Sequence, residues 1–285
     1  MREQLLLEGR SGCGIEFISK QGQVQLRKYA KDIHYNERLI KQKDKQESFL
    51  ISQHLPANFY APKVSAYCEG TKKALAWFDM QYIFGEKYSA FFARVPISKI
   101  DAIIKLFIDY FTRSFRASRQ QQLSSNVFIQ KINQVKAVCR PEIINDNVVK
   151  AAFHFLENEI PDVPVPLNDC HGDFTFSNMI FSDEKIYLVD FLDSFVDSPL
   201  IDLVKLRQDT RLHWTIHIDN SIQPHKKIKL LQILKYFDDK LLNFLYKHEE
   251  LIPWYQYLEK LNLVRILPYL KLNEDMEFVM RALKR

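Results

Sequence analysis

Hydrophobic and polar positions alternate in short runs over the first 85 residues of the chain, and such alternation predicts β-strands. The first two runs are joined by a turn at Gln21-Gly22, and the last two by a polar turn at residues 69–73. Between the two pairs, residues 35–54 have the apolar spacing of a helix. The sequence therefore predicts a small antiparallel sheet with one helix. Its strands are expected at residues 15–17, 24–28, 62–67 and 74–83.

Helical spacing dominates after residue 85. The apolar residues of these helices are expected to form a core rather than a pocket. Because the change of character falls at Gln81–Gly85, the sequence predicts two domains, 1–85 and 86–285. The predicted helices cover residues 98–117, with Ser98 as the expected cap, and residues 145–159, 226–247 and 273–284.

A polar set surrounds one predicted hairpin in the second domain. Apolar strands at residues 179–181 and 186–189 would bring Asn178 back beside Asp190, and Asp173 lies five residues before Asn178. Carboxylate and carboxamide oxygens suit Mg²⁺, which is usually held by one or two carboxylates together with substrate phosphates. In phosphotransferases, one Asp of such a set receives the hydroxyl proton, while an Asn and a second Asp hold the metal.

This set predicts a kinase, with Asp173, Asn178 and Asp190 as catalytic residues and with Asn178 and Asp190 as the metal ligands. The alternative is an ordinary polar hairpin that carries incidental acids. A match of three fixed positions is by itself a weak signal, and its setting between an extended segment and a hairpin strengthens it.

Glycines are concentrated near the beginning of the chain, where Gly9, Gly12 and Gly14 account for three of the seven glycines in the sequence. Glycine allows backbone amides to approach phosphate oxygens closely, because no side chain intervenes. These three residues are therefore candidates for nucleotide binding. The same glycines could equally belong to a simple hairpin.

A lysine follows this segment at the end of an apolar strand face. Alternation places Lys28 on the face of Val24 and Leu26, so we predict that it contacts the nucleotide phosphates. Arg27, on the opposite face, is the alternative. Glu47 is the expected partner of Lys28, since it has helical spacing to residues 40, 50 and 51, although it could instead be a solvated charge. In the segment at the domain boundary, Gln81 and Ile83 are expected to offer backbone groups to the adenine ring.

Composition is consistent with an enzyme of the cytoplasm. Four scattered cysteines without CxxC spacing indicate reduced thiols, not disulfides or a zinc site. The sequence predicts no signal peptide and no membrane insertion, because no apolar run approaches the length of a bilayer. A net charge of +5 is mild for 285 residues, so nucleic-acid binding is not expected. The oligomeric state is left open.

The order of these motifs resembles the aminoglycoside phosphotransferase and choline kinase branch of the protein-kinase-like fold, over about residues 9 to 210. This resemblance implies an α+β bilobal fold, with a small antiparallel-sheet lobe that carries one helix and a larger, mainly helical lobe. It also implies that His171 organises the catalytic loop and that Asp202 supports it. Two positions depart from related patterns: Gly172 stands where protein kinases usually have Arg, and Leu192 stands where the family often has an acid.

The predicted activity is transfer of the γ-phosphate of ATP, with Mg²⁺, to a hydroxyl of a small molecule. Residues 224–285 contain twelve Lys or Arg and eight Asp or Glu, which does not favour a polycationic acceptor. A sugar or sugar phosphate fits this balance better. Two alternatives remain: a catalytically silent, kinase-like nucleotide-binding scaffold, and a protein kinase. Gly172 and the short interval between Asp190 and Pro199 argue against the protein kinase.

Overall fold

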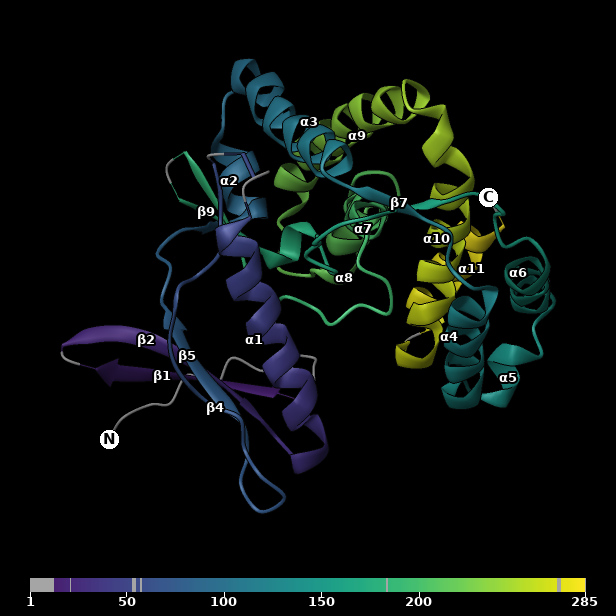
Figure 1. The fold of residues 1–285 in the computed structure, drawn as a ribbon. Coiled ribbons are helices and arrows are strands. Elements are labelled where there is room, and N and C mark those ends of the chain that lie inside the picture. The colour runs from purple at the N-terminus through teal and green to yellow at the C-terminus, as the bar shows by residue number, and fades with distance from the viewer. Residues whose placement is uncertain are drawn as a thin grey trace. The chain divides into compact units, whose positions relative to one another are not determined.

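The computed structural model describes residues 13–20, 22–52, 55–56, 58–182, 184–270 and 273–284. Contacts divide the chain into two compact units, and each takes two stretches of sequence. The first unit comprises the chain up to Arg94 together with Asp169–Ser194, and the second comprises Val95–Asn168 and Phe195–Arg285. Figure 1 shows the elements of both units. The predicted division into domains at residue 85 stays a prediction.

A four-stranded antiparallel sheet and one helix, α1 (Asn36–Ile51), form the first part of the first unit. The helix lies beside the sheet in Figure 1, and a small core that includes Leu39 and Phe78 joins them. This arrangement confirms the sheet with one helix predicted for this region. The strand order is β1 (Cys13–Lys20), β2 (Gln23–Ala30), β5 (Trp77–Gln81) and β4 (Val64–Cys68).

A second four-stranded sheet of the first unit contains the predicted hairpin. Its strands β9 (Met179–Ser182) and β10 (Lys185–Leu188) pair antiparallel, with Met179 opposite Leu188. Aromatic side chains cover this hairpin, since the rings of Phe91 and Phe181 stack with centroids 4.2 Å apart. The strands β3 (Phe59–Tyr60) and β6 (Glu86–Lys87) complete this sheet, in the order β3, β10, β9, β6. The other elements of the unit are α2 (Tyr88–Arg94) and the 3₁₀ turns at Ile33–Tyr35 and Phe176–Asn178.

The second unit is mainly helical and is organised around α7 (Pro199–Thr210), in which every residue except Lys205 is buried. Ser198 caps this helix by accepting a hydrogen bond from the amide of Leu200, and Pro199 occupies the first turn, where a missing N–H costs nothing. Inside the unit, the buried Asp202 accepts a hydrogen bond from the Tyr110 hydroxyl at 2.7 Å. This bond satisfies one oxygen of a carboxylate that burial would otherwise penalise.

The other helices of the second unit include the four predicted ones, each within three residues of its predicted ends, and two longer ones that were not predicted, α4 and α10. A short pair of strands, β7 (Arg119–Gln121) and β8 (Val165–Leu167), completes the unit. The helices are α3 (Ile100–Arg116), α4 (Ser125–Val138), α5 (Pro141–Ile144), α6 (Asn147–Asn158), α8 (Trp214–Ile218), α9 (Pro224–Tyr246), α10 (Ile252–Ile266) and α11 (Asn273–Leu283), with 3₁₀ turns at Ile97–Lys99, Glu249–Leu251 and Leu267–Tyr269.

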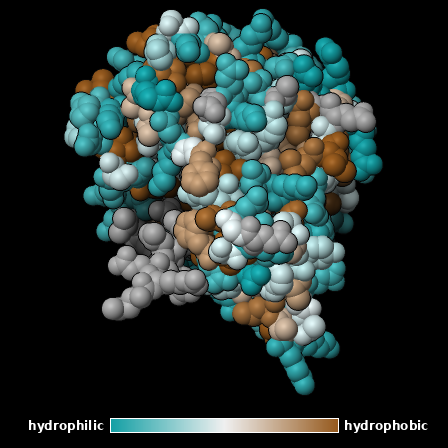
Figure 2. Space-filling model, turned by 90° about the vertical axis from the view of Figure 1, so that its left-hand side faces the viewer, coloured by the Kyte–Doolittle hydropathy of each residue, from teal (hydrophilic) through white to brown (hydrophobic). Residues whose placement is uncertain are grey.

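On the face drawn in Figure 2, hydrophobic residues lie in separate groups among hydrophilic ones. Within the described residues, no helix combines the length and the apolar content needed to cross a bilayer.

Candidate active site

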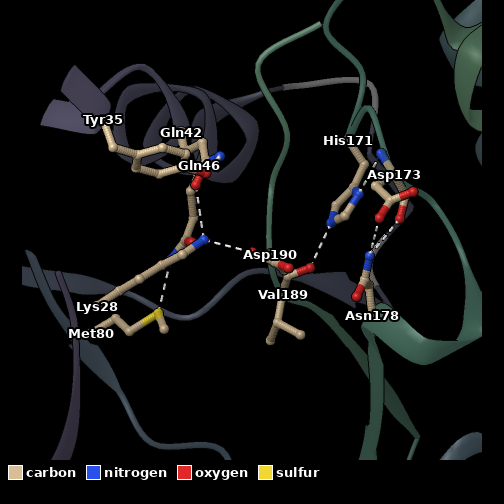
Figure 3. Close-up of polar contacts among 10 residues, drawn as sticks. All are labelled: Lys28, Tyr35, Gln42, Gln46, Met80, His171, Asp173, Asn178, Val189 and Asp190. Atoms are coloured by element: carbon tan, nitrogen blue, oxygen red, sulfur yellow. Dashed lines mark hydrogen bonds and ion pairs between the residues drawn. The ribbon is translucent and has the colours of Figure 1, made fainter. Parts of the chain in front are cut away.

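The loop before β9 brings Asp173 and Asn178 together. The Asn178 amide nitrogen donates hydrogen bonds to the carboxylate Oδ2 and to the backbone oxygen of Asp173, each at 2.9 Å (Figure 3). These two bonds fix the orientation of both side chains. Because the amide nitrogen is used in this way, the amide oxygen of Asn178 is left as the acceptor that it can offer to a ligand.

His171 joins this loop to the segment that follows β10. Its buried ring donates from Nε2 to the carbonyl of Val189 at 2.9 Å, and its Nδ1 accepts from the amide of Asp173 at 3.2 Å. The bond from the Asp173 amide assigns the ring proton to Nε2. Both ring nitrogens are therefore engaged with the backbone, an arrangement suited to positioning rather than to proton exchange.

Asp190 lies two residues after the end of β10, beside the segment that holds Asn178. The amide of Val189 donates to the carbonyl of Asn178 at 3.0 Å, so the backbones at residues 178 and 189 are adjacent. The backbone of Asp190 is left-handed, with φ of 61°, a conformation that Asp and Asn tolerate better than other side-chain-bearing residues. Its side chain is 47% exposed, which leaves the carboxylate accessible.

Lys28 reaches Asp190 from β2. Its side chain is buried, and Nζ donates to Asp190 Oδ1 at 2.5 Å and to Gln42 Oε1 at 2.9 Å (Figure 3). Burial, the largest single influence, would lower the pKa of this ammonium, but the charge of Asp190, its hydrogen bond to Lys28 and the neighbouring Cys13 and Tyr35 together outweigh burial and leave the pKa raised above its usual value. Lys28 is therefore a fixed positive charge. Arg27 lies on the opposite strand face and pairs with Asp79 at 2.7 Å.

The prediction that Glu47 is the partner of Lys28 was wrong. Glu47 does not contact Lys28; its carboxylate pairs with Lys43 at 2.9 Å and is about half exposed. The helix face expected to be buried is partly in solvent, since Ile51 is 81% exposed. The buried face of α1 carries Leu39, Gln42, Lys43, Gln46 and Phe49. Polar residues point inward here because they bond to groups inside the unit, so apolar spacing could not identify this face.

Gln42 holds the place at Lys28 that the sequence assigned to a carboxylate. Its amide nitrogen donates to the Tyr35 hydroxyl at 3.1 Å, which fixes the amide so that its oxygen faces the lysine (Figure 3). One helical turn on, Gln46 donates to the carbonyl of Pro62 at 2.6 Å. The signal that could have revealed this face is the pair of glutamines spaced i, i+4 in an otherwise charged segment.

Lys45 of α1, which the sequence did not single out, contacts both the segment before Asp173 and the segment after Asp190. Lys45 Nζ donates to the carbonyl of Leu192 at 3.0 Å and to the hydroxyl of Ser194 at 3.2 Å, and it lies 3.5 Å from the sulfur of Cys170. Gly172 sits between these segments with φ of +85°. A β-carbon on it would lie 2.4 Å from Ser194 Oγ and 2.6 Å from the Leu192 oxygen, so only glycine fits.

The other predicted nucleotide contacts stay predictions. Gly9 and Gly12 lie outside the described residues. Gly14 lies in β1, where a β-carbon would lie 2.4 Å from the ring of Tyr29, so packing alone accounts for this glycine. The amide of Gln81 donates to the carbonyl of Lys63 at 2.9 Å and is already in use. Ile83 follows β5 and is buried.

The donors present fit Mg²⁺ in the way that phosphotransferases use it. No group of three or more His, Cys, Asp or Glu side chains within the described ranges has the geometry to hold a metal without help. Asp190 and Asn178 offer one carboxylate and one amide oxygen. Mg²⁺ is usually held by few protein ligands together with substrate phosphates, so this sparse pair is suitable.

Solved structures share this fold. The complex of the aminoglycoside phosphotransferase APH(2'')-IIa with streptomycin and ATP gives a TM-score of 0.55 at 14% identity, over 100% of this chain and 92% of that one. The ADP-bound APH(2'')-Ib gives 0.53 at 14% identity, over 99% and 92%. A ternary complex of an APH(4)-Ia variant with AMP-PNP and hygromycin B gives 0.51 at 12% identity, over 92% and 93%. At such identities the likeness establishes the fold alone.

The fold is thus the protein-kinase-like fold of these enzymes, as the sequence predicted. A search of curated proteins found no match. The model of the phosphotransferase enzyme family matches residues 20–223, which is more than half of the chain. The chain belongs to the phosphotransferase enzyme family.

Proposed function

We propose that this protein is a kinase that transfers the γ-phosphate of ATP to a hydroxyl group of a small molecule, with Mg²⁺ as the metal. The observation that carries the proposal is the arrangement of the first unit. A buried lysine is joined to an accessible aspartate, and the hairpin ladder connects that aspartate to the Asp173–Asn178 pair. Phosphoryl transfer requires mainly such positioning and neutralisation of charge.

Each residue has a defined task in this proposal. Asp173, oriented by Asn178, accepts a hydrogen bond from the acceptor hydroxyl and takes its proton late in the transfer. Lys28 contributes its fixed positive charge to the nucleotide phosphates. Asp190 and the amide oxygen of Asn178 would hold Mg²⁺, which supplies neutralisation of phosphate charge when bound. His171 keeps the two segments in register through Val189.

The acceptor is proposed from charge. Aminoglycosides are bound by the phosphotransferases of the similar structures, but residues 224–285 of this chain carry four more basic than acidic residues, twelve against eight. The net positive charge of this segment would repel a polycation. A neutral or anionic hydroxyl compound, such as a sugar or sugar phosphate, is the better candidate.

The test is Mg²⁺-dependent release of ADP from ATP, measured with and without a mixed pool of small hydroxylated metabolites. We expect the pool to stimulate ADP release, and fractionation of the pool then isolates the acceptor. If ATP raises the melting temperature but no pool stimulates release, the scaffold alternative gains support. If ATP neither turns over nor shifts the melting temperature, the proposal is wrong.

Gln42 provides a further prediction about how Lys28 is positioned. Gln42→Leu should lower kcat by about tenfold to a hundredfold, because it removes the Lys28 hydrogen bond and leaves a buried ammonium with one partner fewer. Gln42→Glu should keep most activity, since its carboxylate can accept the same bond. Steady-state kinetics at saturating ATP measure both. Gln23→Leu, in the same strand as Lys28 but exposed, is the control; equal kcat values for the Gln42→Leu variant and the wild-type enzyme would exclude this role.

A further inference from the structure

A cavity of about 480 Å³ lies wholly within the second unit. Sites for small molecules commonly have volumes of about 300–1,000 Å³. The lining residues come mainly from α6, α7, α9, α10 and α11. In Figure 1, α6 is teal and the other four helices are green to yellow. The lining includes apolar side chains, among them Phe155, Leu242 and Leu263. Tyr246 at the cavity is 60% exposed, so the lining reaches solvent.

Charged residues also line the cavity. The first pair of them, Arg207 and Asp238, is saturated by its own hydrogen bonds. Arg207 donates from Nε and Nη2 to the two carboxylate oxygens of Asp238, at 2.8 and 3.0 Å. Its side chain is 3% exposed. Thr210 donates a further hydrogen bond to Asp238 at 3.0 Å. This bidentate pair gives the cavity a neutral polar wall and leaves it little capacity for a ligand.

The second pair, Arg211 and Glu259, leaves part of the guanidinium available to a ligand. Arg211 uses Nη1 alone to reach both oxygens of Glu259, each at 2.7 Å, and the Tyr255 hydroxyl also donates to Glu259 at 2.5 Å. Across the described residues, Nε and Nη2 of Arg211 have no hydrogen-bond partner, and its side chain is 32% exposed. The Nε–Nη2 edge of a guanidinium matches the two oxygens of a carboxylate.

The net charge of the lining residues indicates which charge the ligand should carry. Arg207, Arg211 and Lys260 carry three positive charges against two negative charges of Asp238 and Glu259, which leaves +1. Tyr255 adds none, because burial raises its pKa well above the usual value and the phenol stays neutral. A monoanion would cancel this charge. A phosphate dianion would overshoot it, and a cation would increase it.

We propose that this cavity binds an organic monocarboxylate with an apolar body. The carboxylate lies on the Nε–Nη2 edge of Arg211, within reach of the positive charge of Lys260, and the body packs against the apolar lining residues, which include Phe155, Leu242 and Leu263. The proposal concerns a second ligand site and does not rest on the nucleotide chemistry of the first unit.

The test uses 4-phenylbutyrate as the probe, measured by isothermal titration calorimetry on the full chain. Its matched analogues are 4-phenylbutan-1-ol, which is neutral, and 4-phenylbutylamine, which is cationic. We expect the carboxylate to bind at least about tenfold more tightly than either analogue, the factor that corresponds to one charge-assisted hydrogen bond. Absence of 4-phenylbutyrate binding, or equal binding of all three compounds, overturns the proposal.

Variants locate the site. Arg211→Gln should weaken 4-phenylbutyrate binding by about tenfold or more, whereas Glu259→Gln should strengthen it, because it frees the guanidinium and raises the lining charge to +2. Leu242→Trp should abolish binding by filling the cavity without changing a charge, which covers the case in which Arg211→Gln does not fold. Arg113→Gln removes an exposed arginine of the same unit, paired with Asp109, and should change nothing. Unchanged affinity in both Arg211→Gln and Leu242→Trp would place the probe elsewhere and refute the assignment.

Discussion

Replacement of Asp190 by Asn is expected to reduce ADP release by about 10³-fold or more and to remove the effect of Mg²⁺ on ATP binding. Asn tolerates the left-handed backbone that residue 190 adopts, with φ of 61°, so the variant changes the charge while it keeps the chain path. The lost carboxylate is both the proposed metal ligand and the partner of Lys28. Turnover assays and titrations of ATP with and without Mg²⁺ measure the two effects.

Asp193→Asn is the matched control for this change. Asp193 is an exposed acid three residues along the same segment, and its loss should leave turnover within about twofold of the wild type, as for most surface substitutions. If Asp193→Asn were as inactive as Asp190→Asn, the metal would have to be held differently. Retained turnover in Asp190→Asn would remove the basis of the proposed metal site.

Replacement of Asp173 by Asn should lower kcat by about 10²- to 10⁴-fold, the range that general acid–base catalysis contributes. The affinity for ATP should be unchanged, because Asp173 is assigned to the acceptor hydroxyl and not to the nucleotide. This split between kcat and nucleotide affinity distinguishes it from Asp190→Asn. Initial rates and the ATP-induced shift in melting temperature give the two quantities.

Asp169→Asn serves as the comparison for Asp173, since Asp169 is an exposed acid four residues earlier in the chain. It should turn over ATP at close to the wild-type rate. A weakened ATP-induced shift in Asp173→Asn would mean that the loop contributes to nucleotide binding. Full kcat in that variant would show that another group receives the proton.

The sheet, helix α1 and the β9–β10 hairpin could be predicted because their signals are local. Alternation along β2 separates Lys28 from Arg27, and a short turn returns β10 to β9. Helix α10 could not be predicted in this way, because buried residues such as Trp254, Tyr255 and Leu263 point to different sides of the helix and erase the helical period. Helix α4 did carry a signal, a Ser124 cap followed by buried residues at 128, 132 and 135.

The candidate site also combines residues that a local pattern identifies with contacts that no local pattern contains. Asp173, Asn178 and Asp190 lie close in sequence, so their spacing exposes them. The bond between Lys28 and Asp190 spans 162 residues, and no local pattern contains it. The error at Glu47 has another origin: the inward positions of α1 are taken by amides that bond to Lys28 and Pro62, and hydropathy treats such residues as exposed.

The crowding around Gly172 limits how this enzyme can be regulated. Protein kinases usually have an arginine at this position, which binds a phosphorylated activation loop. Here the β-carbon of any other residue would collide with Ser194 and Leu192, while the backbone holds a φ of +85°. A single substitution therefore cannot install that arginine without displacing the segment after Asp190. Phosphorylation control through this arginine would therefore require the segment after Asp190 to be rebuilt first.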